Sequence, residues 1–419
     1  MRIVVSGRGS RGDVYPVLAI AEALKRQGHE IILCVPDFTR SLALKITENT
    51  IFYREQSHDV MRGLDRGWLA AYRALKWFND SLEGQFSPLF IAASGADILV
   101  TTAGEMVAPS IAEYYGIPHF RVAYAPILPG NQPPPLQPFQ RLPEIANRIL
   151  WKGLNGTVKV LFGKQLNSMR SNLGLQEIAD MGAYFAGKSH TVLAINRLLG
   201  PPSPSWGYDY TYSGYCFYHD RGPLPADLKA FIHAGSKPVY IGFGSVTVSE
   251  PEKFAGMVIG AVKKAGCRAV IGSGWAGLGR GMSVCDVFVT GEVPHGSLFP
   301  LMAGVAHHGG SGTTHNAAAA GVPQFIMPQI ADQFYWGRRV NVLGLGPEPV
   351  VPGMATVDSM AAVFRELCSN TIHRENAAVF SRCLIGENGA EQAASIISRP
   401  GFTAHSLQEL QNCYRPTLQ

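Results

Sequence analysis

Short runs of consecutive apolar residues recur along the chain, and between them apolar residues return every three or four positions. Continuous apolar runs are typical of strands that are buried on both faces, whereas the wider spacing is typical of helices that pack on one side. Their alternation predicts parallel sheets covered by helices on both faces, which is an α/β fold.

The first forty residues form one strand-helix-strand unit. Residues 3–5 and 30–35 predict the two strands, and residues 7–12 predict a glycine-rich turn after the first. We expect Pro16 to open the helix between them, because proline at the first helical position loses no hydrogen bond, and Gly28 to follow its end. Further strands are predicted at residues 97–100, 191–194, 238–243, 268–272, 287–289, 303–307 and 324–328.

The alternation is interrupted at residues 200–205, whose sequence GPPSPS cannot continue a helix. We therefore predict two α/β domains of similar size. Open α/β sheets bind ligands at the carboxyl ends of their strands, so the active site is expected where the two domains face each other. The predicted boundaries are 1–200 for the first domain, 201–216 for the linker, 217–384 for the second domain and 385–419 for a C-terminal helix and tail that returns to the first domain.

Composition narrows the class of protein. The 419 residues are 46% hydrophobic and only 16% charged, which excludes wholesale disorder. No apolar run reaches the roughly 18 residues of a membrane span, and the first residues enter a strand without a signal-peptide cleavage pattern. Seven scattered cysteines form no CxxC motif. Reduced thiols in a cytoplasmic protein are the simplest interpretation.

The net charge of +5 is unevenly placed, since residues 141–170 contain six basic residues and one acid, Glu144. A solvated helix face is one interpretation, and contact with anionic membrane lipid on the inner face of the membrane is the other. Residues 68–78 mix aromatic and basic side chains, which either fill a helix core, line a substrate pocket or face a membrane. No motif of a nucleic-acid-binding module is present, so nucleic acid is not an expected partner.

Residues 307–316, with the sequence HHGGSGTTHN, carry the strongest chemical signal. They follow a predicted strand and precede an alanine-rich helix expected over 316–320. Small residues at a helix start let a ligand approach bare backbone N–H groups at the positive end of the helix dipole. His308, Ser311 and Thr313 add side-chain donors, so the segment predicts a diphosphate site. The alternative is a plain turn with capping hydroxyls.

Asp332 and Gln333 follow the strand predicted at 324–328. A carboxylate beside an amide offers acceptors and donors to neighbouring sugar hydroxyls. Taken alone, Asp332 is more readily interpreted as a helix N-cap. Its place after the strand that follows the phosphate loop favours the sugar site.

Residues 7–12 match GxGxxG literally, which is the dinucleotide fingerprint when it lies between a strand and a helix. The acid expected at the end of the second strand would have to be Asp37, after Pro36, and the better phosphate loop lies in the other domain. A nucleotide-dependent oxidoreductase is therefore a minor alternative.

Four segments together carry a family resemblance: GSRGDVxP at 9–16, VPHxxLFP at 293–300, HHGGSGTT at 307–314 and DQF at 332–334. In this order and spacing the chain resembles the GT-B nucleotide-sugar glycosyltransferases of family 1, above all the sterol glucosyltransferases and the bacterial glycopeptide-antibiotic glycosyltransferases. The resemblance covers roughly residues 1–395.

This resemblance implies two Rossmann-like domains, the first binding the acceptor and the second the nucleotide sugar. It implies that Asp13 is the general base on the acceptor hydroxyl. The nucleobase would contact residues 293–295 with Trp275 nearby, the diphosphate would contact 244–245 and 308–313, and the sugar would contact 332–333. The residues implied in donor binding are Ser10, Arg11, Gly244, Ser245, Trp275, Val293, His295, His308, Gly310, Ser311, Gly312, Thr313, Asp332 and Gln333.

The activity implied is inverting transfer of a hexosyl group, glucose above others, from a UDP- or dTDP-sugar to a hydroxyl of a hydrophobic small molecule or lipid. The chain contains no Asp-x-Asp motif, so neither a cofactor nor a metal ion is expected. Two further alternatives share the scaffold: a sugar-nucleotide epimerase or hydrolase, and a non-catalytic partner that binds nucleotide sugars.

Overall fold

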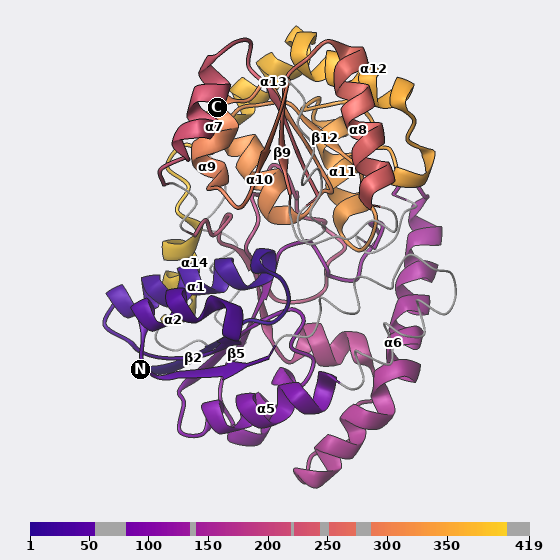
Figure 1. Cartoon of the computed structure of the whole chain (residues 1–419). Helices are drawn as coiled ribbons and strands as arrows, with labels where there is room; N and C mark the ends of the chain where they lie inside the picture. Colours follow the sequence, from indigo (N-terminus) through magenta and orange to yellow (C-terminus); the bar gives the residue numbers. More distant parts are fainter. Residues whose placement is uncertain (55–80, 135–139, 219–221, 244–250, 274–285, 400–419) are drawn as a thin grey trace, which may run out of the picture.

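The computed structural model of the chain contains two parallel sheets, each with helices on both faces (Figure 1). It describes residues 1–54, 81–134, 140–218, 222–243, 251–273 and 286–399. The predicted α/β class is confirmed, and every predicted strand has an observed counterpart. Residues 68–78, with their aromatic and basic side chains, lie outside the described part.

The first sheet has the strand order β3-β2-β1-β4-β5-β6-β7, and the second has the order β10-β9-β8-β11-β12. Three strands of the first sheet, β3, β5 and β7, were not predicted. The strands are β1 (Arg2–Ser6), β2 (Glu30–Pro36), β3 (Thr50–Tyr53), β4 (Ile98–Thr102), β5 (His119–Ala123), β6 (His190–Leu193), β7 (Tyr210–Tyr212), β8 (Val239–Gly242), β9 (Ala269–Gly272), β10 (Val287–Thr290), β11 (Gly304–His307) and β12 (Gln324–Ile326).

Helices fill the layers above and below these sheets. The α-helices of the first half are α1 (Arg11–Arg26), α2 (Arg40–Ile46), α5 (Ala108–Tyr115) and α6 (Glu144–Asn172), and residues 81–93 are also helical. Those of the second half are α7 (Ala226–His233), α8 (Pro251–Ala265), α9 (His295–Leu298), α10 (Ser311–Ala319), α11 (Gln333–Val342), α12 (Val357–Ser369), α13 (Thr371–Arg382) and α14 (Gly389–Ile397). Short turns of other helix types are η1 (Asp37–Thr39), η2 (Ala183–Gly187), η3 (Phe299–Leu301) and η4 (Pro352–Met354).

Strand order places two loops at switch points. β1 pairs with β2 on one side and β4 on the other, and β8 pairs with β9 and β11. In the first sheet the chain runs outward from β1 to β3 on one side and from β4 to β7 on the other, and the second sheet has the same pattern about β8 and β11. At such a switch point the loops after the two central strands diverge, which is where ligands bind in open α/β sheets. The glycine-rich turn after β1 and the HHGG segment after β11 are therefore both at ligand-binding positions of their sheets.

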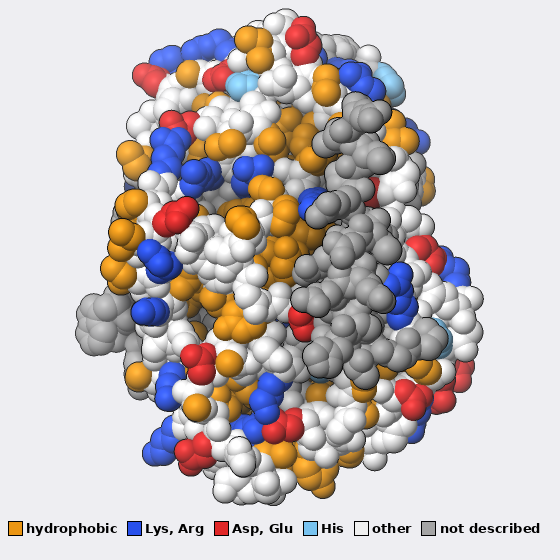
Figure 2. All heavy atoms as spheres, turned by 180° about the vertical axis from the view of Figure 1, so that it is seen from behind, with side chains coloured by type: hydrophobic (Ala, Val, Ile, Leu, Met, Phe, Trp, Pro, Cys, Tyr) orange, Lys and Arg blue, Asp and Glu red, His pale blue; other side chains and the backbone are white. Residues whose placement is uncertain are grey.

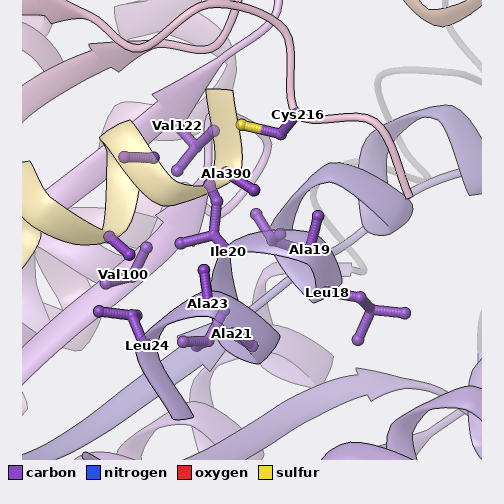
Figure 3. Packing of buried hydrophobic residues seen from close by; sticks show 14 of the residues in the cluster. Leu18, Ala19, Ile20, Ala21, Ala23, Leu24, Val100, Val122, Cys216 and Ala390 are labelled. Carbon is purple, nitrogen blue, oxygen red and sulfur yellow. The ribbon is translucent and has the colours of Figure 1, made fainter. Parts of the chain in front are cut away.

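Helix α1 is buried against one face of the first sheet. Leu18, Ile20 and Leu24 are fully inaccessible and pack among apolar residues of β1, β2, β4, β5 and β6. Alanines of α14 close over the same cluster, so the last described helix lies on the first domain (Figure 3). Helix 81–93, α5 and α6 cover the opposite face of the sheet.

Both helices that begin at the switch points start earlier than predicted. α1 begins at Arg11 rather than Pro16, because Ser10 and Asp13 cap its first turn and the proline is accommodated inside the helix. α10 begins at Ser311 rather than Asn316, so the small residues predicted as a loop form the first helical turn. The predicted end of α1 is confirmed. The helix ends at Arg26, and Gly28 follows in the left-handed region at φ 86°.

The segment that joins the two domains is packed on both. Residues 210–212, within the stretch predicted as linker, add β7 to the edge of the first sheet. Leu199 and Trp206 lie in one apolar cluster with Trp336 of α11 and Phe380 of α13. The five cysteines of the described part are free thiols. No helix among the described residues is long and apolar enough to cross a membrane.

Candidate active site

The turn after β1 fixes the predicted base, Asp13. Its Oδ2 atom accepts hydrogen bonds from the Ser10 backbone N–H and the Ser10 hydroxyl, both at 2.8 Å. Gly9 has φ 110°, and a Cβ there would collide with the Asp13 carboxylate. Asp13 is thus the third residue of α1 and part of its N-terminal cap, where the helix dipole favours a negative charge.

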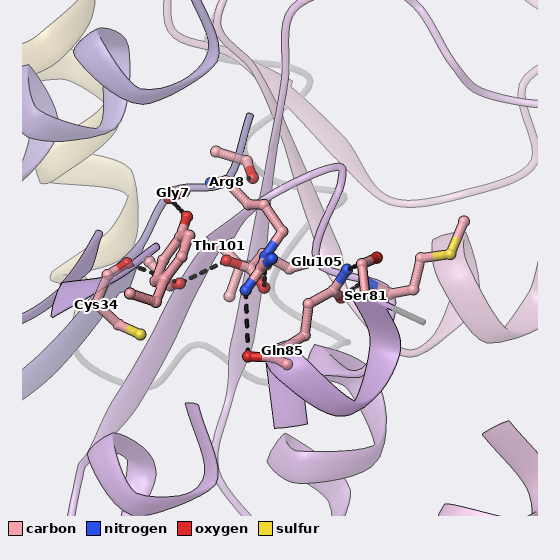
Figure 4. A network of polar contacts seen from close by, with 12 residues as sticks. Gly7, Arg8, Cys34, Ser81, Gln85, Thr101 and Glu105 are labelled. Atoms are coloured by element: carbon pink, nitrogen blue, oxygen red, sulfur yellow. Dashed lines mark hydrogen bonds and ion pairs between the residues drawn. The ribbon is translucent and has the colours of Figure 1, made fainter. Parts of the chain in front are cut away.

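A buried polar network holds the turn between β1 and α1 (Figure 4). The Ser6 hydroxyl donates to Oε1 of Glu105 at 2.6 Å, and Arg8 pairs with the same carboxylate at 3.9 Å. The Arg8 guanidinium also lies over the Tyr53 ring, 4.2 Å from its centroid, and the Tyr53 hydroxyl donates to the carbonyl of Gly7. Contacts from β1, from β3 and from the loop after β4 therefore hold the backbone from which α1 starts.

Two contacts connect the start of α1 to its surroundings. The Tyr124 hydroxyl, just after β5, donates to the Asp13 carbonyl at 2.7 Å. Arg11 forms an ion pair with Glu292, which precedes the predicted nucleobase residues Val293 and His295. The α1 end of the first domain therefore touches the second domain beside its predicted donor site.

Close contacts surround the three glycines of the loop after β11 and the start of α10. Gly309 has φ 93°, and a Cβ there would collide with Ile326. A Cβ on Gly310 would collide with the His308 ring, and one on Gly312 with the Tyr215 hydroxyl. These collisions explain the three glycines, and they leave the first N–H groups of α10 beside Ser311 and Thr313.

His308 is held neutral and incompletely bonded at this position. Burial, with a smaller contribution from His295, lowers the pKa of His308 to about 4. Its Nδ1 atom is buried and has no hydrogen-bond partner in the structure. An unpartnered buried nitrogen beside a helix N-terminus is what a diphosphate oxygen would satisfy.

His295 lies in an aromatic setting. Its ring stacks on Phe299 with centroids 4.4 Å apart and meets Tyr240 edge to face at 5.6 Å. Burial lowers the pKa of His295 to about 4 as well. A neutral ring in an aromatic stack is suited to packing against a base, and its proximity to His308 places the predicted nucleobase and diphosphate residues together.

Asp332 is the N-cap residue of α11, as one of the two interpretations open from the sequence had it, but its side chain makes no capping hydrogen bond. Its Oδ2 atom accepts from Nε1 of the buried Trp336 at 2.9 Å. Burial, with a further contribution from the charge of Asp13, raises the pKa of Asp332 to about 6. The charge of Asp13, on the first domain, thus acts on Asp332 of the second.

The neighbouring residues of Asp332 show how its position is fixed. Ala331 has φ 52° and is the one non-glycine residue with positive φ in the part of the chain that the structure describes. Oε1 of Gln333 accepts from the backbone N–H groups of Gln329 and Ile330 at 2.8 and 3.1 Å. The side-chain carbonyl of Gln333 therefore holds the loop that precedes it.

The structure connects several of the predicted residues in the described part. Arg11 pairs with Glu292, next to residues 293–295, and Gly309 lies against the backbone of Gln333. The charge of Asp13 acts on Asp332. Gly244, Ser245 and Trp275 lie outside the described residues. Sequence reasoning missed Glu105, Tyr124 and Glu292, which have no local motif and act through contacts between distant segments.

Comparison with known proteins identifies the family. Residues 3–129 match the glycosyltransferase family 28 N-terminal domain, and residues 283–392 match the C-terminal domain of erythromycin biosynthesis protein CIII-like proteins. The chain is 33% identical to glycosyltransferase GtfE of Amycolatopsis orientalis over 94% of this chain and 99% of that protein. It is 32% identical to the vancomycin aglycone glucosyltransferase of the same organism, over 95% and 97%.

More distant relatives agree with this assignment. A sterol 3-beta-glucosyltransferase of Kluyveromyces lactis is 29% identical over 96% of this chain and 35% of its own length. Among solved structures, the kitacinnamycin glycosyltransferase has the same fold, with a TM-score of 0.73 and 18% identity over 94% of this chain and 98% of that one. The predicted GT-B architecture is confirmed. The chain belongs to the family of the glycopeptide-antibiotic glycosyltransferases and sterol glucosyltransferases, and it is a glycosyltransferase of the GT-B fold.

Proposed function

We propose that the protein transfers a glucosyl group, with inversion, from a UDP- or dTDP-sugar to a hydroxyl of a hydrophobic natural product or lipid. One observation carries this proposal: Arg11, two residues before the capped carboxylate of Asp13, pairs across the domains with Glu292 beside the predicted donor site. The charge of Asp13 also acts on Asp332 of the second domain. A base on one domain then faces a sugar and a diphosphate held by the other.

The relatives' names support the choice of donor and acceptor. Among them are glucosyltransferases, one named for the vancomycin aglycone and others for sterols. A solved structure of the same fold, VinC, is in complex with dTDP. These names favour glycosyl transfer over an oxidoreductase, an epimerase or hydrolase, and a silent binding partner, since all of them are transferases.

In the proposed reaction the first domain supplies the base and the second domain stabilises the leaving diphosphate. The acceptor hydroxyl attacks the anomeric carbon, the bond from that carbon to the diphosphate oxygen breaks, and the hydroxyl proton passes to Asp13. A positioned base of this kind contributes typically about 10²–10⁴-fold to the rate. The leaving diphosphate gains charge, which the first N–H groups of α10, the Ser311 and Thr313 hydroxyls and the His308 ring would stabilise as fixed dipoles.

We propose that this stabilisation requires no divalent metal ion. The α10 N-terminus and His308 supply donors to the leaving diphosphate. The expected result is that EDTA leaves the transfer rate unchanged, and loss of activity restored by Mg²⁺ or Mn²⁺ would overturn this part.

We also propose peripheral contact with anionic lipid through one face of α6. Ile145, Ile149 and Val160 are 67%, 64% and 81% exposed, and at 100° per residue they share a face with exposed Arg148 and Lys159. Apolar and basic side chains are intermixed along the flank where α6 lies, at the left of Figure 2. Such a face combines apolar insertion with attraction to anionic headgroups.

Vesicle flotation tests this contact. The protein is expected to float with phosphatidylglycerol vesicles and not with phosphatidylcholine vesicles, and the double change Ile145→Ser with Ile149→Ser should abolish flotation. Ile385→Ser is the matched control, because Ile385 is 80% exposed outside α6. Equal flotation of both variants, or none of the wild type, would overturn the contact.

Calorimetric titration tests the donor. UDP-glucose and dTDP-glucose are titrated into wild-type protein and His308→Ala, with NADPH as the competing hypothesis for the GxGxxG turn. Binding of a sugar nucleotide that weakens about tenfold in the variant is expected, because a hydrogen bond to a charged group contributes about 1.5–3 kcal/mol. Binding of NADPH alone would overturn the proposal.

A further inference from the structure

His315, in the second turn of α10, reaches out of its own domain. Its side chain is almost fully inaccessible to solvent. Its Nε2 atom accepts a hydrogen bond of 3.0 Å from the backbone N–H of Asn196, which lies three residues after the end of β6 in the first domain. The helix predicted to bind the diphosphate is therefore bonded directly to the chain that leaves the acceptor domain.

The hydrogen bonds define one protonation state for this ring. Since Nε2 is an acceptor, the proton must be on Nδ1, which lies 2.7 Å from the carbonyl oxygen of Ser311 and donates to it. The ring stacks on Tyr215 of the linker with centroids 4.4 Å apart, and it meets Trp336 edge to face at 5.2 Å. The two nitrogens of His315 thus bond to Asn196 of the first domain and to Ser311 of α10, and the ring packs on Tyr215 and Trp336.

Asn196 makes a second connection from the same point. Its Oδ1 atom accepts from the backbone N–H groups of Leu198 and Leu199 at 2.8 and 3.1 Å, which fixes the turn that starts the linker. Its Nδ2 atom lies 3.1 and 3.2 Å from the two carboxylate oxygens of Glu387. Glu387 stands just before α14, where the chain returns to the first domain.

The chain passes from the first domain to the second after Asn196 and returns after Glu387, so the two connecting segments meet where these residues bond. α14 packs on α1, the helix that carries Asp13, with an ion pair between Glu391 and Arg26 at 2.5 Å. On the other side, Trp336 connects the His315 ring to Asp332. The contact between His315 and Asn196 thus joins α10 directly to the outgoing linker and, through Glu387, to the returning chain.

We propose that His315 and Asn196 form the pivot between the domains, and that His315 is a positioning residue which sets the diphosphate-binding end of α10 relative to Asp13. This inference rests on the proposed glycosyl transfer, because the distance between base and donor matters only for a reaction across the interface. A small misplacement of reacting groups is sufficient to lower a rate by orders of magnitude.

Two substitutions separate this role from mere packing. His315→Leu keeps an apolar group in the site but removes both hydrogen bonds. His315→Gln supplies a carbonyl that accepts from Asn196 and an amide that donates to Ser311, so it should restore the pivot. His373→Leu is the matched control, because His373 of α13 also bonds a backbone carbonyl and a side chain, but both partners, Gly344 and Glu366, belong to its own domain.

The kinetic readout is the division between kcat and donor binding. For His315→Leu we expect kcat to fall tenfold to a hundredfold while the Kd for the nucleotide sugar changes less than threefold, because most of the predicted donor contacts lie within the second domain. His315→Gln should recover kcat to within threefold of the wild type, and His373→Leu should keep it. An equal loss of kcat and affinity in His315→Leu, or no recovery in His315→Gln, would overturn the positioning role.

A second readout does not depend on activity. Hydrogen exchange of the Asn196 amide should be strongly protected in the wild type and His315→Gln, and at least tenfold faster in His315→Leu. Unchanged protection in His315→Leu would overturn the pivot itself. Absence of transfer by the wild type with intact protection would instead overturn the proposed function, so the two failures are distinguishable.

Discussion

Asp332 carries an unfavourable charge, and its substitution should separate stability from function. Burial, with the nearby charge of Asp13, raises its pKa from the ordinary 3.8 to about 6. This change costs the ionised form at most about 3 kcal/mol. The residue keeps partial solvent contact, so we take about 2 kcal/mol. Asp332→Asn removes this cost and retains an oxygen that accepts from Trp336.

The sign of the pH dependence follows from the raised pKa. Below pH 3.8 the carboxyl is protonated in both the folded and unfolded states, and its ionisation costs nothing. Between about pH 4 and 6 the folded state holds the Asp332 proton more tightly than the unfolded state does, so the free energy of unfolding falls as the pH rises. Above pH 6 this loss of stability has reached its full size. The advantage of Asp332→Asn should therefore be about 2 kcal/mol at pH 8 and about half of that at pH 5.

Differential scanning calorimetry of wild-type and variant protein at the two pH values measures this. For a domain of this size, about 2 kcal/mol corresponds to a rise of roughly 4–8 °C in Tm. Asp358→Asn is the control, since the Asp358 side chain is 76% exposed on α12. The same Asp332→Asn variant should bind nucleotide sugar at least tenfold more weakly. A Tm difference that does not change with pH, or a destabilised variant, would refute the reasoning.

Three further substitutions test other strained or unpaired positions. Ala331→Gly should raise the free energy of unfolding by about 0.5 kcal/mol, because relief of the left-handed backbone exceeds the added entropy of the unfolded chain; a loss of stability in urea titration would contradict this. Gly9→Ala should lower Tm and activity together, since its Cβ would displace the Asp13 carboxylate, and wild-type kinetics would argue against the turn geometry. Arg121 of β5 is buried, with its Nε atom unpartnered and its pKa lowered to about 10 by burial. Arg121→Met should therefore stabilise the protein by about 1 kcal/mol or more in urea titration, and destabilisation would show that the cation is compensated.

The sheets were predictable because their strands are continuous apolar runs. Both switch-point loops follow such strands, so the sequence alone placed Asp13, His308 and Asp332 at carboxyl ends that face a common interface. The starts of α1 and α10 were predicted too late for different reasons. Pro16 was given the first helical position, although the Ser10–Asp13 cap already starts the helix. The small residues 311–313 have low helix propensity but still form the first turn of α10.

The pivot and the support of the active-site turn could not be predicted from the sequence. Asn196 and Glu387 are 191 positions apart, and Ser6 and Glu105 are 99 apart. No local spacing signals such contacts, because they depend on how two sheets and two chain crossings are brought together. His315 had a visible place next to the phosphate loop, but only the structure shows that its ring faces the linker rather than the diphosphate site.

The most direct test of the account is the rate of glucosyl transfer by wild-type protein and Asp13→Asn. UDP-glucose and dTDP-glucose serve as donors, with the vancomycin aglycone and a sterol as acceptors and nucleoside diphosphate release as the signal. The amide oxygen of the substituted side chain would still accept from the Ser10 N–H, so the helix cap and donor affinity should be preserved while kcat falls at least tenfold. An unchanged kcat in Asp13→Asn would contradict the central claim that this capped carboxylate is the base.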